Sequence, residues 1–155
     1  MPNRAEWPGE FWTALPSPSF KYADAIKDIK DCPPDTCSSR RTQAFRVVFS
    51  DPPNTQSFLP VAMRNPGRRL DPKSLCIAYG LSFFDSIGHL KAKMRILKKN
   101  YPRIEATIGS KIAEGVIEQK DGKSNTPNSS GHFTLHEFRE CELHKKFTVV
   151  ADAIT

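Results

Sequence analysis

The chain has no apolar run that approaches the roughly 18 residues needed to cross a membrane as a helix. Residues 1–20 contain four prolines and lack the continuous apolar stretch of a secretory signal. We therefore expect no signal peptide, no membrane partner and a cytoplasmic location. In a reducing cytoplasm, the four cysteines of the chain are expected to be free thiols.

Two kinds of motif are also missing. The sequence has no internal repeat and neither the Rossmann nor the P-loop glycine pattern, so those two phosphate-binding loops are excluded. It has no Cys-x2-Cys pair, and the cysteines of "CPPDTC" lie about a hundred residues before the histidines of "HFTLHEFRECELH". We expect no structural metal, although a metal-dependent hydrolase that uses His132, His136 and His144 remains an alternative.

What is present is enough for one domain. A chain of 155 residues can bury a single hydrophobic core. Its formal net charge of +6 and pI near 9.3 favour an anionic ligand or a polyanionic partner, and ordinary solubility charge is the alternative. Thirteen prolines and eight glycines indicate many turns rather than a helical bundle.

The first 43 residues differ from the rest of the chain. "EWPGEFWTALPSPSFKY" mixes aromatic residues with prolines, so it cannot form one regular element. "KYADAIKDIKDC" predicts a short helix that ends before Pro33. We therefore divide the chain into an N-terminal segment, residues 1–43, and a folded domain, residues 44–155. The N-terminal segment either covers the domain or docks onto a partner, through Trp7, Phe11, Trp12, Leu15 and Phe20.

The folded domain combines strand and helix signals. "AFRVVFS" alternates between two faces and predicts a strand, and "LCIAYGLSFF" predicts a second strand with one face of small side chains. Asp85 or Ser86 would cap a helix that ends at Pro102. "KIAEGVIEQ", "HFTLHEF" and "FTVVADAI" predict three further strands. The expected fold class is α+β, with a small mixed or antiparallel sheet and few helices.

The predicted helix is strongly basic. No acidic residue occurs between Ser86 and Ile104, and a second basic stretch, "RNPGRR", lies upstream. Such a face is either a solvated surface or a surface that contacts phosphates, and the complete lack of acids favours the second interpretation. The residues that we expect to contact nucleic acid are Lys91, Arg95, Lys98 and Lys99 of the helix and Arg68 and Arg69 of the loop.

Four stretches together carry a resemblance. "FRVVFSDPPNTQSF", "YGLSFFDS", "IAEGVI" and "GHFTL" resemble a group of short, mostly uncharacterised bacterial proteins. The layout of those proteins is similar to the small ADP-ribosyltransferase-like fold, in which a split sheet pinches NAD in a cleft. The resemblance covers roughly Ala44 to Ile154 and leaves out the N-terminal segment.

The resemblance implies where the nucleotide would bind. Arg46, on the first strand, would bind the nucleotide end, because a guanidinium fork suits a diphosphate. Ser82, on the second strand just before the helix, would brace the nicotinamide ribose, with Tyr79 nearby. Phe83 or Phe84 would stack on the nicotinamide ring.

The resemblance also implies a third group, on a later strand, that orients the ribose and the incoming nucleophile. Glu137 and His132 are the expected catalytic residues, and Glu114 is a further candidate on the preceding strand. The Glu-x-Glu or Gln-x-Glu signature usual at this position is missing from the two strand stretches "KIAEGVIEQ" and "HFTLHEF". A catalytically degenerate module that binds nucleic acid or protein with the same fold therefore remains an alternative.

The function implied is an NAD-dependent ADP-ribosyltransferase of the toxin or phage-defence type. The basic surface favours nucleic acid, and RNA in particular, as the molecule that is modified. A toxin of this kind would need a neutralising antitoxin protein, and the aromatic N-terminal segment is a candidate contact for it.

Overall fold

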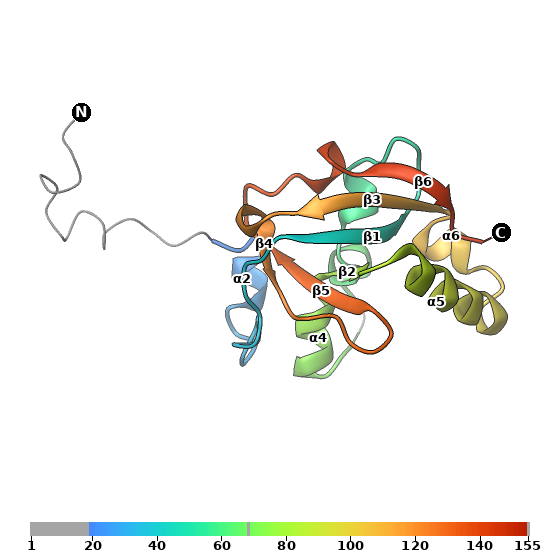
Figure 1. The fold of residues 1–155 in the computed structure, drawn as a ribbon. Coiled ribbons are helices and arrows are strands. Elements are labelled where there is room, and N and C mark those ends of the chain that lie inside the picture. Colours follow the sequence, from blue (N-terminus) through green and yellow to red (C-terminus); the bar gives the residue numbers. More distant parts are fainter. Residues whose placement is uncertain (1–18, 68, 155) are drawn as a thin grey trace, which may run out of the picture.

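A computed structural model describes residues 19–67 and 69–154, whose centre is a six-stranded antiparallel sheet (Figure 1). In spatial order the strands are β4 (Gly122–Ser124), β5 (His132–Glu137), β2 (Leu81–Phe84), β1 (Thr42–Val48), β3 (Lys111–Ile117) and β6 (Thr148–Asp152). The prediction of an α+β fold is confirmed, and every strand pair is antiparallel.

The helices are short, except for one. The α-helices of the described residues are α2 (Ala23–Ile26), α3 (Val61–Arg64), α4 (Pro72–Ala78), α5 (Ile87–Asn100) and α6 (Ile104–Ile108). The 3-10 turns are η2 (Thr55–Phe58), η3 (Gln119–Asp121) and η4 (Leu143–Lys145). Within residues 19–67 and 69–154, no helix has the length and apolar character of a membrane span.

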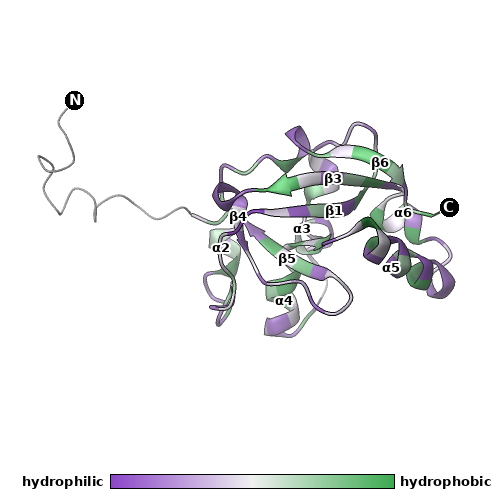
Figure 2. Cartoon of the chain, viewed as in Figure 1, coloured by the Kyte–Doolittle hydropathy of each residue, from purple (hydrophilic) through white to green (hydrophobic). Residues whose placement is uncertain are grey.

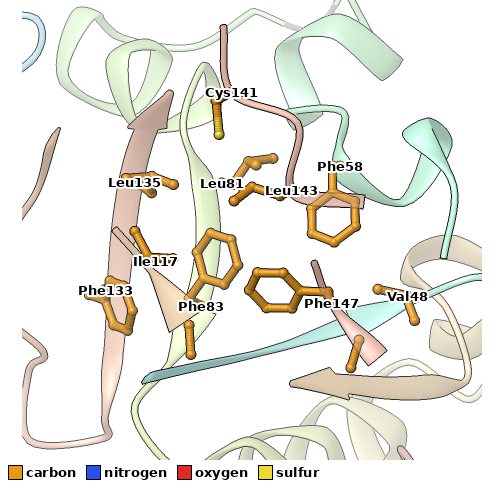
Figure 3. Packing of buried hydrophobic residues seen from close by; sticks show 12 residues of the cluster. Val48, Phe58, Leu81, Phe83, Ile117, Phe133, Leu135, Cys141, Leu143 and Phe147 are labelled. Atoms are coloured by element: carbon orange, nitrogen blue, oxygen red, sulfur yellow. The ribbon is translucent and has the colours of Figure 1, made fainter. Parts of the chain in front are cut away.

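Each face of the sheet carries its own hydrophobic core. On one face, Phe83 packs between Phe133 and Phe147, with ring centroids 5.8 Å and 5.7 Å apart (Figure 3). On the other face, α5 buries Leu90 and Met94 against the sheet. Successive residues of a strand point to opposite faces, so each central strand contributes side chains to both cores.

Helix α5 forms where the sequence predicts it. The Ser86 hydroxyl caps the helix by accepting the backbone N–H of His89 at 3.1 Å. Leu90 and Met94 occupy its buried side, while the side that faces outward is basic. In Figure 2, hydrophilic and hydrophobic residues alternate along α5 accordingly.

The prediction of one strand over residues 75–84 is wrong in its first half. Residues 72–78 form α4, and only Leu81–Phe84 form β2. The physical reason is a strong helix start, because the Asp71 carboxylate accepts the Ser74 backbone N–H at 2.8 Å and Pro72 occupies the first turn. Tyr79 therefore ends a helix and does not lie on a strand.

Residues 19–41 of the N-terminal segment lie against the domain. Phe20 forms a β-bridge with Phe138, and Lys21 N–H donates to the Glu137 carbonyl at 2.8 Å. The helix predicted there is reduced to the single turn of α2. Trp7, Phe11, Trp12 and Leu15 lie outside the described residues, so their proposed contacts stay predictions.

A disulfide joins the N-terminal segment to α4. Cys32 and Cys76 are bonded, with their Cα atoms 5.6 Å apart, while Cys37 and Cys141 are free and buried. The expectation of four free thiols is therefore wrong for one pair. No local signal marks this pair, because its two cysteines are 44 residues apart in the sequence.

The centre of the sheet is nearly split. β1 and β3 are paired from Thr42↔Ile117 to Val48↔Lys111, whereas β1 and β2 share the single register pair Phe45↔Phe84. Across this opening, β5 runs at an angle to β1 (Figure 1). The split is the feature that positions the site described below.

We expect the disulfide to stabilise the fold measurably. Cys32→Ala/Cys76→Ala should lower the free energy of unfolding by about 2–4 kcal/mol, because it frees a 44-residue loop in the unfolded chain. Urea denaturation with and without reductant measures this difference. Reductant should lower the stability of the wild type and of Cys37→Ala but leave the double variant unchanged. Four reactive thiols in the untreated wild type would contradict the assignment.

Candidate functional site

The split between β1 and β2 opens onto a pocket of about 460 Å³. Its walls come from β1, β2, η2, α3, α4, α5, α6 and the first residue of β5. The charged groups on its lining are Arg46, Arg64 and Lys93, and no carboxylate of the described residues lines it. The remaining lining is mostly apolar, so the pocket combines an electropositive part with a hydrophobic part.

Arg46 fills the opening between the two strands. Its Nε donates to the Ser57 carbonyl at 2.9 Å, and its Nη1 donates to the Ser82 carbonyl at 2.8 Å. Its guanidinium carbon lies 5.8 Å from the ring centroid of Phe58 and 5.7 Å from that of Phe83. Arg46 therefore satisfies a β2 carbonyl at the point where the strands stop pairing.

Ser82 and His132 meet across β2 and β5. The His132 Nε2 and Ser82 Oγ atoms are 3.0 Å apart, and Ser82 is exposed to the pocket. The edge of the His132 ring packs on Phe84, with centroids 5.4 Å apart. Gly131, directly before His132, has a φ of 78°, and a Cβ there would collide with the side chains of Asp85 and His89 near the start of α5.

The electrostatics of the pocket follow from its cations. Burial, and then the Lys93 ammonium, lower the pKa of His132 below its ordinary value of 6.5. His132 is therefore neutral at pH 7 and can accept a proton. Burial, and then the neighbouring Arg64 guanidinium, lower the pKa of Arg46 to about 10, so that Arg46 stays charged at pH 7.

The structure brings together three of the predicted site residues. Arg46 of β1, Ser82 of β2 and His132 of β5 all line the pocket. Tyr79 and Phe83 do not line it: the Tyr79 ring lies 6.3 Å from that of Tyr22, and Phe83 is fully buried in the core (Figure 3). Phe83 thus supports Arg46 from the core and is not available to stack on a ligand.

Glu137 lies elsewhere. It is five residues along β5 from His132, so its side chain points to the opposite face of the sheet. Its Oε2 pairs with Lys21 Nζ at 3.0 Å, and the carboxyl is almost completely buried. Burial raises the pKa of Glu137, against the lowering effect of Lys21. Glu137 lines a separate pocket of about 440 Å³.

The predicted nucleic-acid contacts divide into groups. Arg95, Lys99 and Arg69 are exposed, and Lys91 is half-buried. Lys98 is engaged, since its Nζ bonds the Glu105 carboxylate at 2.6 Å and the Pro102 carbonyl at 2.8 Å. Arg68 lies outside the described residues. Glu114, the further catalytic candidate, bonds Gln43 at 2.9 Å and does not line the 460 Å³ pocket.

Two cations of the pocket were missed by sequence reasoning. Arg64 belongs to the basic stretch "RNPGRR", and Lys93 to the basic helix, but nothing local separates them from their exposed neighbours. Phe49, Val61 and Ile77, which are exposed apolar residues of the pocket lining, were missed for the same reason. The tertiary structure alone shows that these five residues line the pocket.

No family model, curated protein or solved structure matches the chain. The ADP-ribosyltransferase resemblance therefore rests on the four sequence stretches quoted above. No group of three or more His, Cys, Asp or Glu side chains in residues 19–67 and 69–154 converges as metal ligands would. His132, His136 and His144 thus form no metal site in the described part of the chain.

The pKa of His132 provides a direct check of the site. We expect an NMR titration to give a value below 6.5 for the wild type, rising in Lys93→Gln because a nearby positive charge is removed. Lys99→Gln, which removes a charge from the same helix away from the pocket, should leave the value unchanged. A wild-type pKa at or above 6.5 would mean that the ring is solvated.

Proposed function

We propose that this protein transfers ADP-ribose from NAD, with the 460 Å³ pocket as its nucleotide site. One observation carries the proposal. Arg46, Ser82 and His132 come from three strands and are far apart in sequence, yet they line the same pocket. These are three of the positions that the resemblance assigns to nucleotide binding and catalysis.

The lining of the pocket suits a nucleotide. Three cations without a carboxylate favour an anionic group, and an apolar wall favours a planar ring. Ile77 and Leu97 belong to this wall, and Phe49 lies at its exposed edge. A volume of about 460 Å³ lies within the range of small-molecule sites.

The neutral His132 supplies the acid–base group of the reaction. The bond that breaks joins ribose C1′ to the nicotinamide nitrogen, and its electron pair leaves with nicotinamide. The bond that forms joins C1′ to an oxygen or nitrogen of the acceptor, whose proton passes to His132 Nε2 and then to water. The Ser82 hydroxyl, held by His132, is positioned to bond a ribose hydroxyl.

The resemblance allows either His132 or Glu137 as the catalytic residue, and we assign this role to His132. Glu137 lies on the opposite face of the sheet, buried and paired with Lys21. The role of a carboxylate near an oxocarbenium-like ribose is electrostatic, and no carboxylate of the described residues lines this pocket. That same observation favours a second candidate function, a module that binds a nucleotide or nucleic acid without catalysis.

The acceptor that we propose is nucleic acid, with RNA favoured. Lys93 lines the pocket, and Lys91, Arg95 and Lys99 continue the positive charge along α5. A strand held along this helix would have its phosphates next to the pocket. The setting as a toxin with a neutralising partner is a further proposal that rests on the resemblance.

Labelled NAD incubated with total RNA, DNA or lysate protein tests the transferase proposal. We expect label transfer by the wild type, a rate about 100-fold lower in His132→Ala because the general base is lost, and a smaller loss in Ser82→Ala. His144→Ala is the matched control, since His144 does not line the pocket. Bacteria that express the wild type should grow more slowly than those that express His132→Ala.

Glu137→Gln separates the two catalytic assignments in the same assay. A loss as large as that of His132→Ala, in a variant shown to be folded, would return the catalytic role to Glu137. If the wild type binds NAD but transfers ADP-ribose to none of the acceptors, the second candidate function, a binding module without catalysis, is favoured. Absence of NAD binding by the wild type would overturn the proposal for the pocket as a whole.

The contribution of α5 to nucleic-acid binding has its own test. Replacing Lys91, Arg95 and Lys99 with Gln should weaken RNA binding and reduce the slope of log affinity against log salt by about 0.7 for each phosphate that is no longer neutralised. Lys98→Gln should change little, because Lys98 is already bonded to Glu105. Fluorescence anisotropy between low and physiological salt measures both. A salt-independent wild-type affinity would rule out phosphate contacts.

A further inference from the structure

Arg46 and Arg64 line one pocket, and no carboxylate of the described residues lines it with them. Neither guanidinium forms a salt bridge with a carboxylate of the described residues, whereas other cations of the protein do, such as Lys21 with Glu137. Partly buried charges are expected to be paired, because removal from water is unfavourable for them. Glu137 raises the pKa of Arg46 without forming a salt bridge, and neither arginine has a carboxylate in direct contact within residues 19–67 and 69–154.

Arg64, at the end of α3, contacts Phe49 and Thr107. Its guanidinium carbon lies 5.5 Å from the Phe49 ring centroid, and its Nη1 donates to the Thr107 carbonyl at 3.1 Å. Its Nε is buried and has no hydrogen-bond partner in the part of the chain that the structure describes. Burial lowers the pKa of Arg64, which is the sign of a charged group that has lost solvation.

Arg46 is fixed in a similar way and lies close enough for repulsion. Its Nε and Nη1 are held by the Ser57 and Ser82 carbonyls. After burial, the Arg64 guanidinium lowers the pKa of Arg46, against the raising effect of Glu137, so Arg64 destabilises the charge on Arg46. An anion bound between them would offset both the repulsion and the lost solvation, and it would meet donors that need little reorganisation.

We propose that Arg46 and Arg64 form a subsite for the diphosphate of a dinucleotide, with Arg64 as its specificity-determining residue. This inference rests on the proposed function for its ligand, NAD. It assigns to Arg64 a role that its place in the basic stretch "RNPGRR" did not suggest. Two guanidiniums match the two negative charges of a diphosphate ester. A planar fork also binds phosphate oxygens in pairs, which a lysine cannot do.

The apolar surroundings limit the other anions that would fit. Phe49 covers one side of Arg64, and the neighbouring Val61 and Ile77 are exposed apolar residues of the same pocket. A ligand with a diphosphate and a planar ring would use both parts, whereas inorganic phosphate would use one. We therefore expect affinity to rise from phosphate to pyrophosphate and from AMP to ADP.

Calorimetry on the full chain tests the subsite with inorganic phosphate, pyrophosphate, NAD and nicotinamide riboside, which has no phosphate. Arg64→Gln should weaken pyrophosphate and NAD binding about tenfold or more, since a charge-assisted hydrogen bond is removed, and leave nicotinamide riboside unchanged. Arg69→Gln is the matched control, because Arg69 lies in the same basic stretch, "RNPGRR", is exposed and does not line the pocket. Arg64→Lys keeps the charge and should still bind more weakly than the wild type.

Each outcome decides between the claims. Equal losses in Arg64→Gln and Arg69→Gln, or pyrophosphate that binds no better than phosphate, would overturn the subsite. Wild-type NAD binding that Arg64→Gln and Arg64→Lys leave unchanged would overturn it while the proposed function stands. Arg64-dependent pyrophosphate binding without NAD binding would overturn the proposed function instead. Melting curves identify any variant that is unfolded, and Arg64→Lys then carries the comparison.

Discussion

The insertion of Arg46 between β1 and β2 is the interaction on which the rest of the structure depends. Two strands that share one register pair would leave backbone groups unsatisfied, and the Arg46 guanidinium bonds the Ser82 carbonyl in place of the missing ladder. The rings of Phe58 and Phe83 support it from the core. A partly buried charge thus keeps the sheet open, and the opening becomes the pocket. Fold and site have the same origin.

Much of the fold follows from local patterns in the sequence. Alternation in "AFRVVFS" and "HFTLHEF" identified strands, and the Ser86 cap with helical spacing identified α5, because both signals are set by neighbouring residues. The apolar run of residues 75–84 was predicted as one strand because its composition suits a strand. The helix that occupies its first half begins at Asp71 and Pro72, which lie outside the run. The Cys32–Cys76 bond has no local signal at all.

The candidate site divides in the same way. Arg46, Ser82 and His132 could be named because the resemblance assigns roles to strand positions, and all three residues lie on strands in the structure. Glu137 was named from the same strand as His132, but five residues of alternation separate the two, so their side chains lie on opposite faces of the sheet. Arg64 reaches the pocket only through the packing of α3 near Phe49 and Thr107, which no spacing in the sequence reveals.

The disulfide has a consequence for how the pocket meets a ligand. α4 provides part of the pocket wall through Ser74, Ile77 and Ala78, and the same short helix carries Cys76. The disulfide between Cys76 and Cys32 restricts the conformations of α4 before any ligand binds. The entropy of ordering α4 is therefore lost when the chain folds, not when a ligand binds. Residues 19–43 of the N-terminal segment do not line the pocket, but through Cys32 they contribute to its preorganisation in this way.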